Sequence, residues 1–121
     1  MHQPADIVSQ FLDLVVNPDV PLIRSLKDFD RVVKMSESPF KQLSKNQIDD
    51  FRSNLKFNKQ KGGVASFKYT EIKANLSKAS YLKVLEMFGL SETMADDHQG
   101  YACVDVGDCV TNQTHICTSN C

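Results

Sequence analysis

Apolar side chains recur every three or four positions through residues 1–55, which is the spacing of one face of an α-helix. The pattern predicts three short amphipathic helices, over residues 6–16, 21–35 and about 44–55. Asn17-Pro18 ends the first, because a proline disfavours helical geometry in the residue before it. Ser44-Lys45-Asn46-Gln47 has the spacing of a capping box and begins the third. The three apolar stripes can bury one another, so a small helical bundle is expected.

The pattern changes beyond residue 53. Leu55 and Phe57 alternate with polar residues, residues 58–63 are rich in turn formers, and residues 64–69 are rich in strand formers. This succession predicts a short β-hairpin over about residues 53–69.

A fourth helix is predicted over residues 77–88. Ser77 is a good N-cap, and Gly89 stands where a left-handed residue commonly ends a helix. Ser91 is expected to cap one further turn. No periodicity follows Gly100, so the tail is predicted to be irregular.

Together these elements predict a mainly α fold: a small bundle of short amphipathic helices with a short β-hairpin and an irregular, cysteine-rich C-terminal tail. A length of 121 residues fits one small domain. Within it we distinguish three segments: a helical body over 1–56, a basic loop or hairpin plus helix over 57–90, and an acidic tail over 91–121.

Charge is distributed unevenly, although the net charge is only −1. Residues 56–89 contain seven Lys and two Glu, a charge of +5, whereas residues 90–121 contain five acidic residues and no basic one, a charge of −5. The opposite signs favour contact between these segments, while two separately solvated faces would give the same composition. The lysines are not interleaved with aromatic residues, which disfavours nucleic-acid binding.

Several functional classes lack their sequence signals. The N-terminus has no basic region followed by an uninterrupted apolar run, and no apolar run is long enough to span a bilayer. We therefore expect a cytoplasmic, bacterial protein without a membrane span. A phosphate-binding loop, an HExxH motif, a dinucleotide fingerprint and a nucleophile elbow are all missing, so no enzymatic activity and no catalytic residue are expected.

The distinctive chemistry of the sequence is its C-terminal cysteine cluster, Cys103-x5-Cys109-x7-Cys117-x3-Cys121. Four thiolates satisfy tetrahedral zinc, with His115 as a further nitrogen donor, but structural zinc motifs usually bring their cysteines in CxxC pairs, which this tail lacks. Two disulfides would instead staple a segment that has no core of its own, given an oxidising environment. The third interpretation is that the tail is the substrate of a modifying enzyme.

The tail repeats a Thr-x-x-Cys unit, at residues 114–117 and again at 118–121. Dehydration of such a threonine gives an electrophile that a thiol three residues away can reach, and cysteines are also open to oxidative modification. The first two cysteines have no Ser or Thr at that spacing, so thioether rings would not explain all four thiols. The candidate modified residues are Cys103, Cys109, Cys117, Cys121, Thr111, Thr114, Thr118 and Ser119.

The segment Phe11-Leu12-Asp13-Leu14-Val15-Val16-Asn17-Pro18 precedes an amphipathic stretch over residues 22–33 and the capped helix at Ser44. This order resembles the nif-type leader peptides of ribosomally synthesised, post-translationally modified peptides, over about half of the chain. The resemblance implies a helical leader recognised by a modifying enzyme and a Cys- and Ser/Thr-rich core after it. The recognition residues that it suggests are Phe11, Leu12, Val15, Leu22, Leu26 and Phe29. Such leaders usually end in a double glycine directly before the core, whereas Gly62-Gly63 lies far ahead of Cys103.

We therefore predict a precursor peptide of a modified natural product, whose residues from about 101 onward are the core. Its expected partners are a maturation enzyme and a processing protease or exporter that could carry the mature tail out of the cell, and no cofactor is expected. The alternative is a small zinc- or disulfide-stabilised binding protein in which the cysteine tail is a structural clip. In that alternative, zinc is the candidate cofactor.

Overall fold

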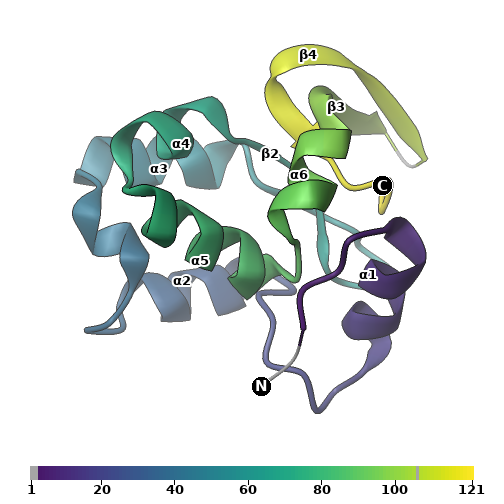
Figure 1. The fold of residues 1–121 in the computed structure, drawn as a ribbon, viewed down its shortest axis with the longest axis horizontal. Coiled ribbons are helices and arrows are strands. Elements are labelled where there is room, and N and C mark those ends of the chain that lie inside the picture. Colours follow the sequence, from purple (N-terminus) through teal and green to yellow (C-terminus); the bar gives the residue numbers. More distant parts are fainter. Residues whose placement is uncertain (1–2, 106) are drawn as a thin grey trace.

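The computed structural model describes residues 3–105 and 107–121. Within these ranges the chain forms six α-helices, one 3-10 helix and four strands, with 46% of residues helical and 21% in strands. The helices are α1 (Val8–Val16), α2 (Leu26–Val33), η1 (Pro39–Gln42), α3 (Lys45–Ser53), α4 (Thr70–Asn75), α5 (Lys78–Phe88) and α6 (Glu92–His98). The strands are β1 (Lys56–Phe57), β2 (Val64–Lys68), β3 (Gln99–Asp105) and β4 (Asp108–Cys117). Helices α2 to α5 gather on one side of the molecule, and the β3–β4 hairpin extends on the other (Figure 1).

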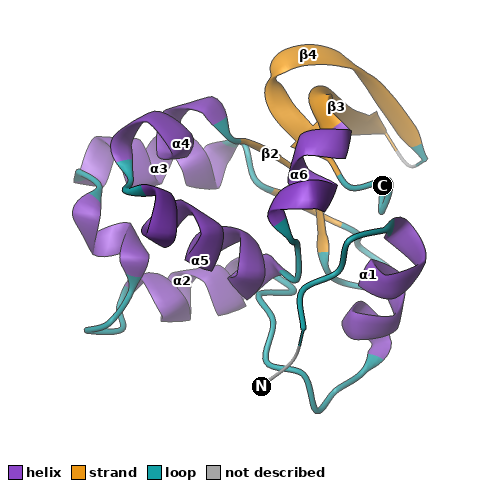
Figure 2. Cartoon of the chain, viewed as in Figure 1, coloured by secondary structure: helices purple, strands orange, loops and turns teal. Residues whose placement is uncertain are grey.

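The four strands form a single antiparallel sheet in the order β1-β2-β4-β3. Strand β4 is therefore internal and pairs with β3 on one side and β2 on the other. On the β2 side, Phe67 lies opposite Ile116 and Ser66 lies opposite Cys117. The C-terminal region is thus built into the sheet, and α6 packs against the two strands of its hairpin (Figure 2).

Serine side chains begin four of the α-helices. The hydroxyls of Ser25, Ser44, Ser77 and Ser91 each accept a hydrogen bond from a backbone N–H in the first turn. The capping box of Ser44 and Gln47 is complete, and Gly89 ends α5 with a φ of +99°. The predicted helices that begin at Ser44, Ser77 and Ser91 are confirmed.

The second helix is shorter than the apolar periodicity predicts. It begins at Leu26 rather than near residue 21, because Ser25 provides the N-cap. The preceding residues are used for tertiary contact, where the Ile23 N–H donates to the Met87 carbonyl oxygen at 2.9 Å. The short helix α4 and the helix η1 were not predicted.

Six of the seven phenylalanines fill one continuous core. They are Phe11, Phe29, Phe40, Phe51, Phe67 and Phe88, each fully buried. The ring of Phe51 on α3 lies at their centre, with the ring centroid of Phe67 on β2 at 5.8 Å and that of Phe88 on α5 at 6.1 Å. Ile116 on β4 belongs to the same core. The helices and the sheet, and all three sequence segments, are therefore stabilised by one shared apolar interior.

The prediction of a mainly α fold is wrong: the described chain is mixed α/β, with a four-stranded antiparallel sheet. The hairpin predicted near residues 53–69 exists as the β1–β2 pair, but it is only half of the sheet. The tail predicted to be irregular supplies the other half. Its strands escaped detection because their buried positions are occupied by alanine and cysteine, with Ile116 as the large apolar residue among those described.

Candidate functional site

The β3–β4 hairpin carries all four cysteines of the chain, either in its strands or just after them. Asp105 pairs with Asp108 at the end of the ladder, next to Gly107, whose φ is +74°. A positive φ is readily adopted by glycine, which favours a tight connection at this point. The Gly107 N–H also donates to the carbonyl oxygen of Cys121 at 2.9 Å, so the final residues fold back onto the hairpin.

The cysteines form two disulfides, Cys103–Cys121 and Cys109–Cys117, with Cα–Cα distances of 5.9 and 6.4 Å. These distances lie in the usual range for a disulfide. The two bonds are neighbours, because the sulfur atoms of Cys109, Cys117 and Cys121 all lie within 4.8 Å of one another. Cys103 and Cys117 are buried, and the other two are half-buried. We call these four residues the cysteine cluster.

The residues between the last two cysteines are anchored to β2 by polar contacts. Thr118 is fully buried, and its Oγ1 lies 2.7 Å from the carbonyl oxygen of Val64 and 3.0 Å from that of Ala65. The Asn120 side-chain amide donates to the Gly62 carbonyl oxygen at 3.0 Å. Buried polar groups with such partners favour one backbone geometry, so these contacts act together with the disulfides in fixing this part of the chain.

An open groove of about 1020 Å³ lies beside the cysteine cluster. Its walls come from residues 24–26, from residues 55–62 and from the cluster itself, through Cys103 and Cys121. The groove therefore joins segments from both ends of the chain, and the Cys103–Cys121 disulfide holds one of its walls.

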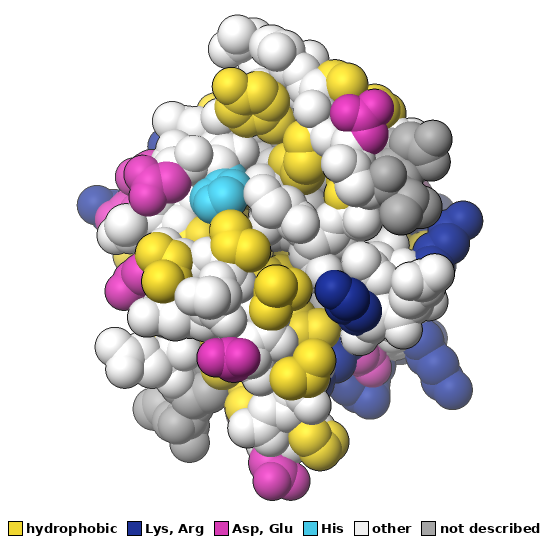
Figure 3. Space-filling model, turned by 90° about the vertical axis from the view of Figure 1, so that its right-hand side faces the viewer, with side chains coloured by type: hydrophobic (Ala, Val, Ile, Leu, Met, Phe, Trp, Pro, Cys, Tyr) yellow, Lys and Arg dark blue, Asp and Glu magenta, His cyan; other side chains and the backbone are white. Residues whose placement is uncertain are grey.

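The groove is cationic. Arg24, Lys56, Lys59 and Lys61 line it, and none of the Asp and Glu side chains that the structure describes does so. The apolar part of its lining includes Leu26, Phe57 and Val104. Figure 3 shows one face of the molecule, where apolar side chains form a band from top to bottom and most of the visible Lys and Arg side chains lie toward its right-hand margin.

The four cations differ in what they contact. The Arg24 guanidinium donates to the carbonyl oxygens of Leu14, Val15 and Asn17, so it caps the C-terminal end of α1. The Lys56 Nζ donates to the Cys103 carbonyl oxygen at 2.8 Å. Lys59 and Lys61 are exposed on the loop and form no ion pair with any residue that the structure describes. These two ammonium groups are available to a ligand.

Two histidines lie near the cluster without joining it. His98, at the end of α6, places its Nδ1 3.0 Å from the Cys117 carbonyl oxygen, which can only accept a hydrogen bond, so Nδ1 is the donor. His115 places its Nδ1 2.8 Å from the Thr114 hydroxyl. Burial, together with the nearby Lys68 and Lys56, lowers the pKa of His115 below its usual value. The neutral imidazole is the form favoured there.

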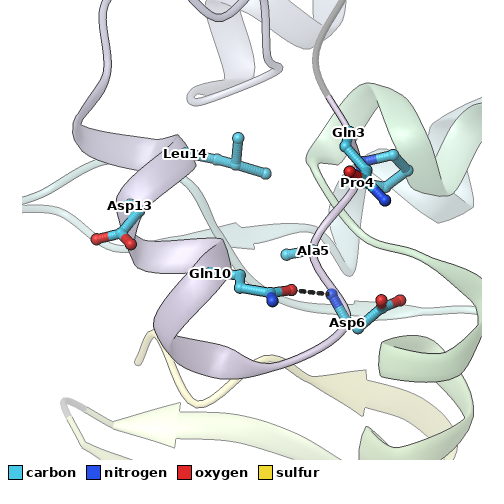
Figure 4. A pocket seen from close by; sticks show the side chains of 7 residues that line it. All are labelled: Gln3, Pro4, Ala5, Asp6, Gln10, Asp13 and Leu14. Carbon is cyan, nitrogen blue, oxygen red and sulfur yellow. Dashed lines mark hydrogen bonds between the residues drawn. The ribbon is translucent and has the colours of Figure 1, made fainter.

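A second, smaller hollow of about 300 Å³ lies at the N-terminal side of α1 (Figure 4). Gln10 on α1 uses its side-chain oxygen to accept a hydrogen bond from the Asp6 backbone N–H at 3.0 Å. The carboxylates of Asp6 and Asp13 point away from each other in Figure 4, so they do not form a paired acidic site. Among the described residues that line this hollow, no set of ionisable or nucleophilic groups converges on one point.

The structure places the predicted modification residues in very different surroundings. All four cysteines are in disulfides, and Thr118 is buried. Thr111 and Ser119 are exposed, and Thr114 is half-buried. His115, the predicted spare metal ligand, is not among the residues whose donor atoms converge with the sulfurs. Whether any of these residues is modified remains a prediction.

The predicted recognition residues are mostly inside the molecule. Phe11, Val15, Leu22 and Phe29 are buried, and Leu12 is half-buried. Leu26 alone of the six is exposed, at 37%, and it lines the groove. Docking of this stripe on a maturation enzyme stays a prediction, and it would require the first helices to leave the core.

Sequence reasoning missed the lysines of the groove as site residues. The charge count located a basic segment, but only the antiparallel pairing of β2 with β4 brings Lys56 to Cys103. The predicted contact between the basic segment and the acidic tail is present, although it is made through backbone groups at this point. Asn120 anchors the tail to Gly62, and no motif or periodicity in the sequence indicates this role.

Comparison with known proteins gave no match among family models, curated proteins or solved structures. The site must therefore be interpreted from its own geometry. Among the helices of the described chain, none is long and apolar enough to cross a membrane.

Proposed function

We propose that this chain is a small disulfide-stabilised binding protein whose groove takes an acidic, partly apolar polypeptide segment of a partner. The observation that carries the proposal is the composition of the groove: four cationic side chains, no Asp or Glu among the side chains that the structure describes, and an apolar part of the lining. Complementary charge steers such a partner and fixes its register, while the apolar lining gains from burial.

The size of the groove supports a polymeric ligand over a single ion. Its volume of about 1020 Å³ is at the upper end of the range of about 300–1,000 Å³ that is typical of small-molecule sites. A nucleic acid is disfavoured, because Phe57 is the single aromatic residue in the described lining and single strands bind through successive aromatic platforms. An extended peptide with alternating acidic and apolar side chains fits both features of the lining.

The disulfides support the same proposal by fixing the site before binding. The Cys103–Cys121 bond holds the tail against the hairpin, and Lys56 then bridges from β1 to the Cys103 carbonyl oxygen. Because this wall is already rigid in the free protein, less conformational entropy is lost when the partner binds. The cysteine tail is in this view finished structure, as in the structural-clip alternative.

The test is binding of a fluorescently labelled peptide of alternating Glu and Leu residues to the oxidised full chain, followed by anisotropy at low and at physiological salt. The variant Lys59→Glu/Lys61→Glu is expected to weaken binding by about tenfold, which corresponds to about 1.4 kcal/mol. The matched control is Lys41→Glu/Lys83→Glu, which makes the same change of charge at exposed lysines outside the groove.

Three results would count against the proposal. These are no binding by the wild-type chain, equal loss in the groove and control variants, or tighter binding of a thymidine oligonucleotide than of the peptide. The third result would assign the groove to nucleic acid.

The precursor hypothesis remains a second proposal. The position of the hairpin favours it, because β3 and β4 extend beyond the helices and expose Thr111 (Figure 1). It requires free thiols at the moment of modification. Trypsin cannot cut after Lys83, so residues 84–121 emerge as one peptide. A mass change in this peptide from the native host that survives reductant would support the precursor, and a mass explained by reducible disulfides alone would exclude it.

A further inference from the structure

Three sulfur atoms converge at one point of the sheet and the fourth is bonded to one of them, although the cysteines are spread along the sequence from Cys103 to Cys121. Cys103 and Cys109 are opposite each other in the β3–β4 ladder, and Cys117 ends β4. The sulfurs of Cys109, Cys117 and Cys121 lie within 4.8 Å of one another, and that of Cys103 is bonded to Cys121. The fold of β3, β4 and the final residues thus supplies the close pairs that CxxC spacing supplies in common zinc motifs.

We propose that the cysteine cluster is a zinc site in the reduced chain, in which the four thiolates bind one Zn²⁺. Two equivalents of a dithiol reductant each donate two electrons and two protons, so both disulfides become four thiols and the reductant becomes two disulfides. Binding of Zn²⁺ then releases the four thiol protons and gives a Zn(Cys)₄ centre with a charge of −2.

The backbone already holds the ligands near the geometry that zinc requires. Tetrahedral Zn–S bonds of about 2.3 Å place the sulfurs about 3.8 Å apart. The separations of up to 4.8 Å between the Cys121 sulfur and those of Cys109 and Cys117 need a contraction of about one ångström. Each bonded pair, Cys103–Cys121 and Cys109–Cys117, instead moves apart once it is reduced. Side-chain rotation can supply both movements. The strand ladder and the bond from Gly107 to the Cys121 carbonyl oxygen position the ligands independently of the disulfides.

A buried hydroxyl beside the cluster supplies a second observation. Ser66 is 1% exposed, and its Oγ has no hydrogen-bond partner among the described residues. It lies opposite Cys117 in the β2–β4 ladder, and directly opposed residues project from the same face of a sheet. A buried hydroxyl without a partner is costly, whereas a thiolate at Cys117 would accept its proton in a hydrogen bond.

The charge around the cluster also favours a dianionic centre. Lys56 is opposite Ser66 in the β1–β2 ladder, and its ammonium donates to the Cys103 carbonyl oxygen. Lys59 and Lys61 line the same groove as Cys103 and Cys121. These cations offset the −2 charge of four thiolates on zinc.

The experiment is anaerobic titration of the full chain with Co²⁺ after reduction by a phosphine, which is oxidised to its oxide as water supplies the oxygen. One equivalent of Co²⁺ is expected to give the sulfur-to-metal charge-transfer and visible bands of a tetrahedral thiolate site. One equivalent of Zn²⁺ should abolish those bands. About four protons should be released per metal, as measured with a pH indicator at a pH where the thiols are protonated.

Three variants separate the cluster from its surroundings. Cys109→Ser should lose the four-sulfur spectrum, and His115→Gln should keep it. Ser66→Ala should weaken Co²⁺ binding by about tenfold, as loss of outer-sphere partners typically does. Lys59→Glu/Lys61→Glu should still bind one Co²⁺, so failure of the groove proposal leaves this one standing.

The proposal is overturned if the reduced chain binds less than one Co²⁺, or binds it without thiolate bands, whether circular dichroism shows that chain folded or unfolded. It is equally overturned if the oxidised chain gives the same spectrum, because the disulfide sulfurs cannot then be the ligands.

Discussion

Cys103 and Cys109 face each other across the β3–β4 ladder, yet each is bonded to a cysteine nearer the C-terminus. The two disulfides therefore do not join residues that the β3–β4 ladder already pairs. They clip the end of β4 and the final residues against it, closing loops with sequence separations of 8 and 18 residues.

Loss of the longer clip is predicted to destabilise the whole protein. In Cys103→Ser/Cys121→Ser, the unfolded chain regains the entropy of the open loop, and the free energy of unfolding should fall by about 3 kcal/mol. Denaturant titration followed by circular dichroism at the helical signal measures the effect, because the tail shares its core with the helices through Ile116. An unchanged helical transition would mean that the tail is energetically separate, as the precursor hypothesis expects.

The Thr118 hydroxyl is predicted to contribute to the same attachment. Thr118→Val keeps the shape of the side chain but removes the donor to the Val64 and Ala65 carbonyl oxygens. Unfolding free energy should fall by about 1–2 kcal/mol, the usual cost of such a loss in a buried site. Thr111→Val, at an exposed position of β4, is the control and should change stability by less than about 0.5 kcal/mol. Equal effects would contradict the assigned role of Thr118.

The helical half of the fold could be predicted because its signals are local. Ser44 with Gln47, and Ser77 with Gly89, mark helix ends through contacts between residues close in sequence, and the structure contains those contacts. The same reasoning found the β1–β2 pair, whose connection is short. Local chemistry was sufficient for these elements.

The sheet and the groove could not be predicted because their contacts are distant in sequence. Strand β4 has few large apolar residues, and its position is fixed by pairs such as Phe67 with Ile116, which stand in the middle and at the end of the chain. The sulfurs converge because the ladder sets Cys103 opposite Cys109 and the path of β4 brings the Cα atoms of Cys109 and Cys117 within 6.4 Å, for which cysteine spacing alone carries no signal. The interior positions of Phe11 and Phe29 likewise follow from tertiary packing, whereas their helical stripe is compatible with either a core or a docking face.

Phe51 is predicted to couple the helical layer to the sheet. Its ring contacts Phe29 on α2 and Phe67 on β2, with centroid distances of 5.7 and 5.8 Å. Phe51→Ala should cost about 3–5 kcal/mol through lost burial and a residual cavity. Thermal unfolding should remain a single transition, with near- and far-ultraviolet circular dichroism changing together at a lower Tm. Separate transitions for the two layers would show that they do not share one cooperative core.

The pair of Asp30 and Arg52 is predicted to give a small acid-sensitive stabilisation. Two hydrogen bonds of 2.8 and 2.9 Å from the guanidinium hold the pKa of the Asp30 carboxyl below its usual value. The folded state therefore binds fewer protons than the unfolded state near pH 3–4, the ordinary range of an aspartate. The contribution is present above about pH 4 and is lost as pH falls through the folded pKa.

In Asp30→Asn, the Tm should be slightly lower than in the wild type at pH 6, and the two values should converge as the pH falls through the lowered folded-state pKa of Asp30. The effect is small because the side chains of Arg52 and Asp30 are 44% and 43% exposed, and salt screens the pair. Scanning calorimetry from pH 2 to 7 at low salt provides the measurement. If the Tm of the variant depends on pH as the wild-type Tm does, Asp30 is not the carboxyl that gives the acid-sensitive stabilisation.

Gly63 is predicted to be the most sensitive glycine of the chain, because two independent costs meet there. Its φ is +83°, and a Cβ would lie 2.6 Å from Val15 Cγ2 and 3.1 Å from the Asn120 side-chain nitrogen. Gly100 has a similar φ of +96° but nothing within 4 Å of a Cβ, so Gly100→Ala isolates the backbone cost of about 1 kcal/mol. Gly63→Ala should lose at least about 1–3 kcal/mol more, since the clash displaces α1 and the Asn120 anchor of the tail. Denaturant titration of both variants measures the difference, and equal losses would mean that Val15 and Asn120 yield without cost.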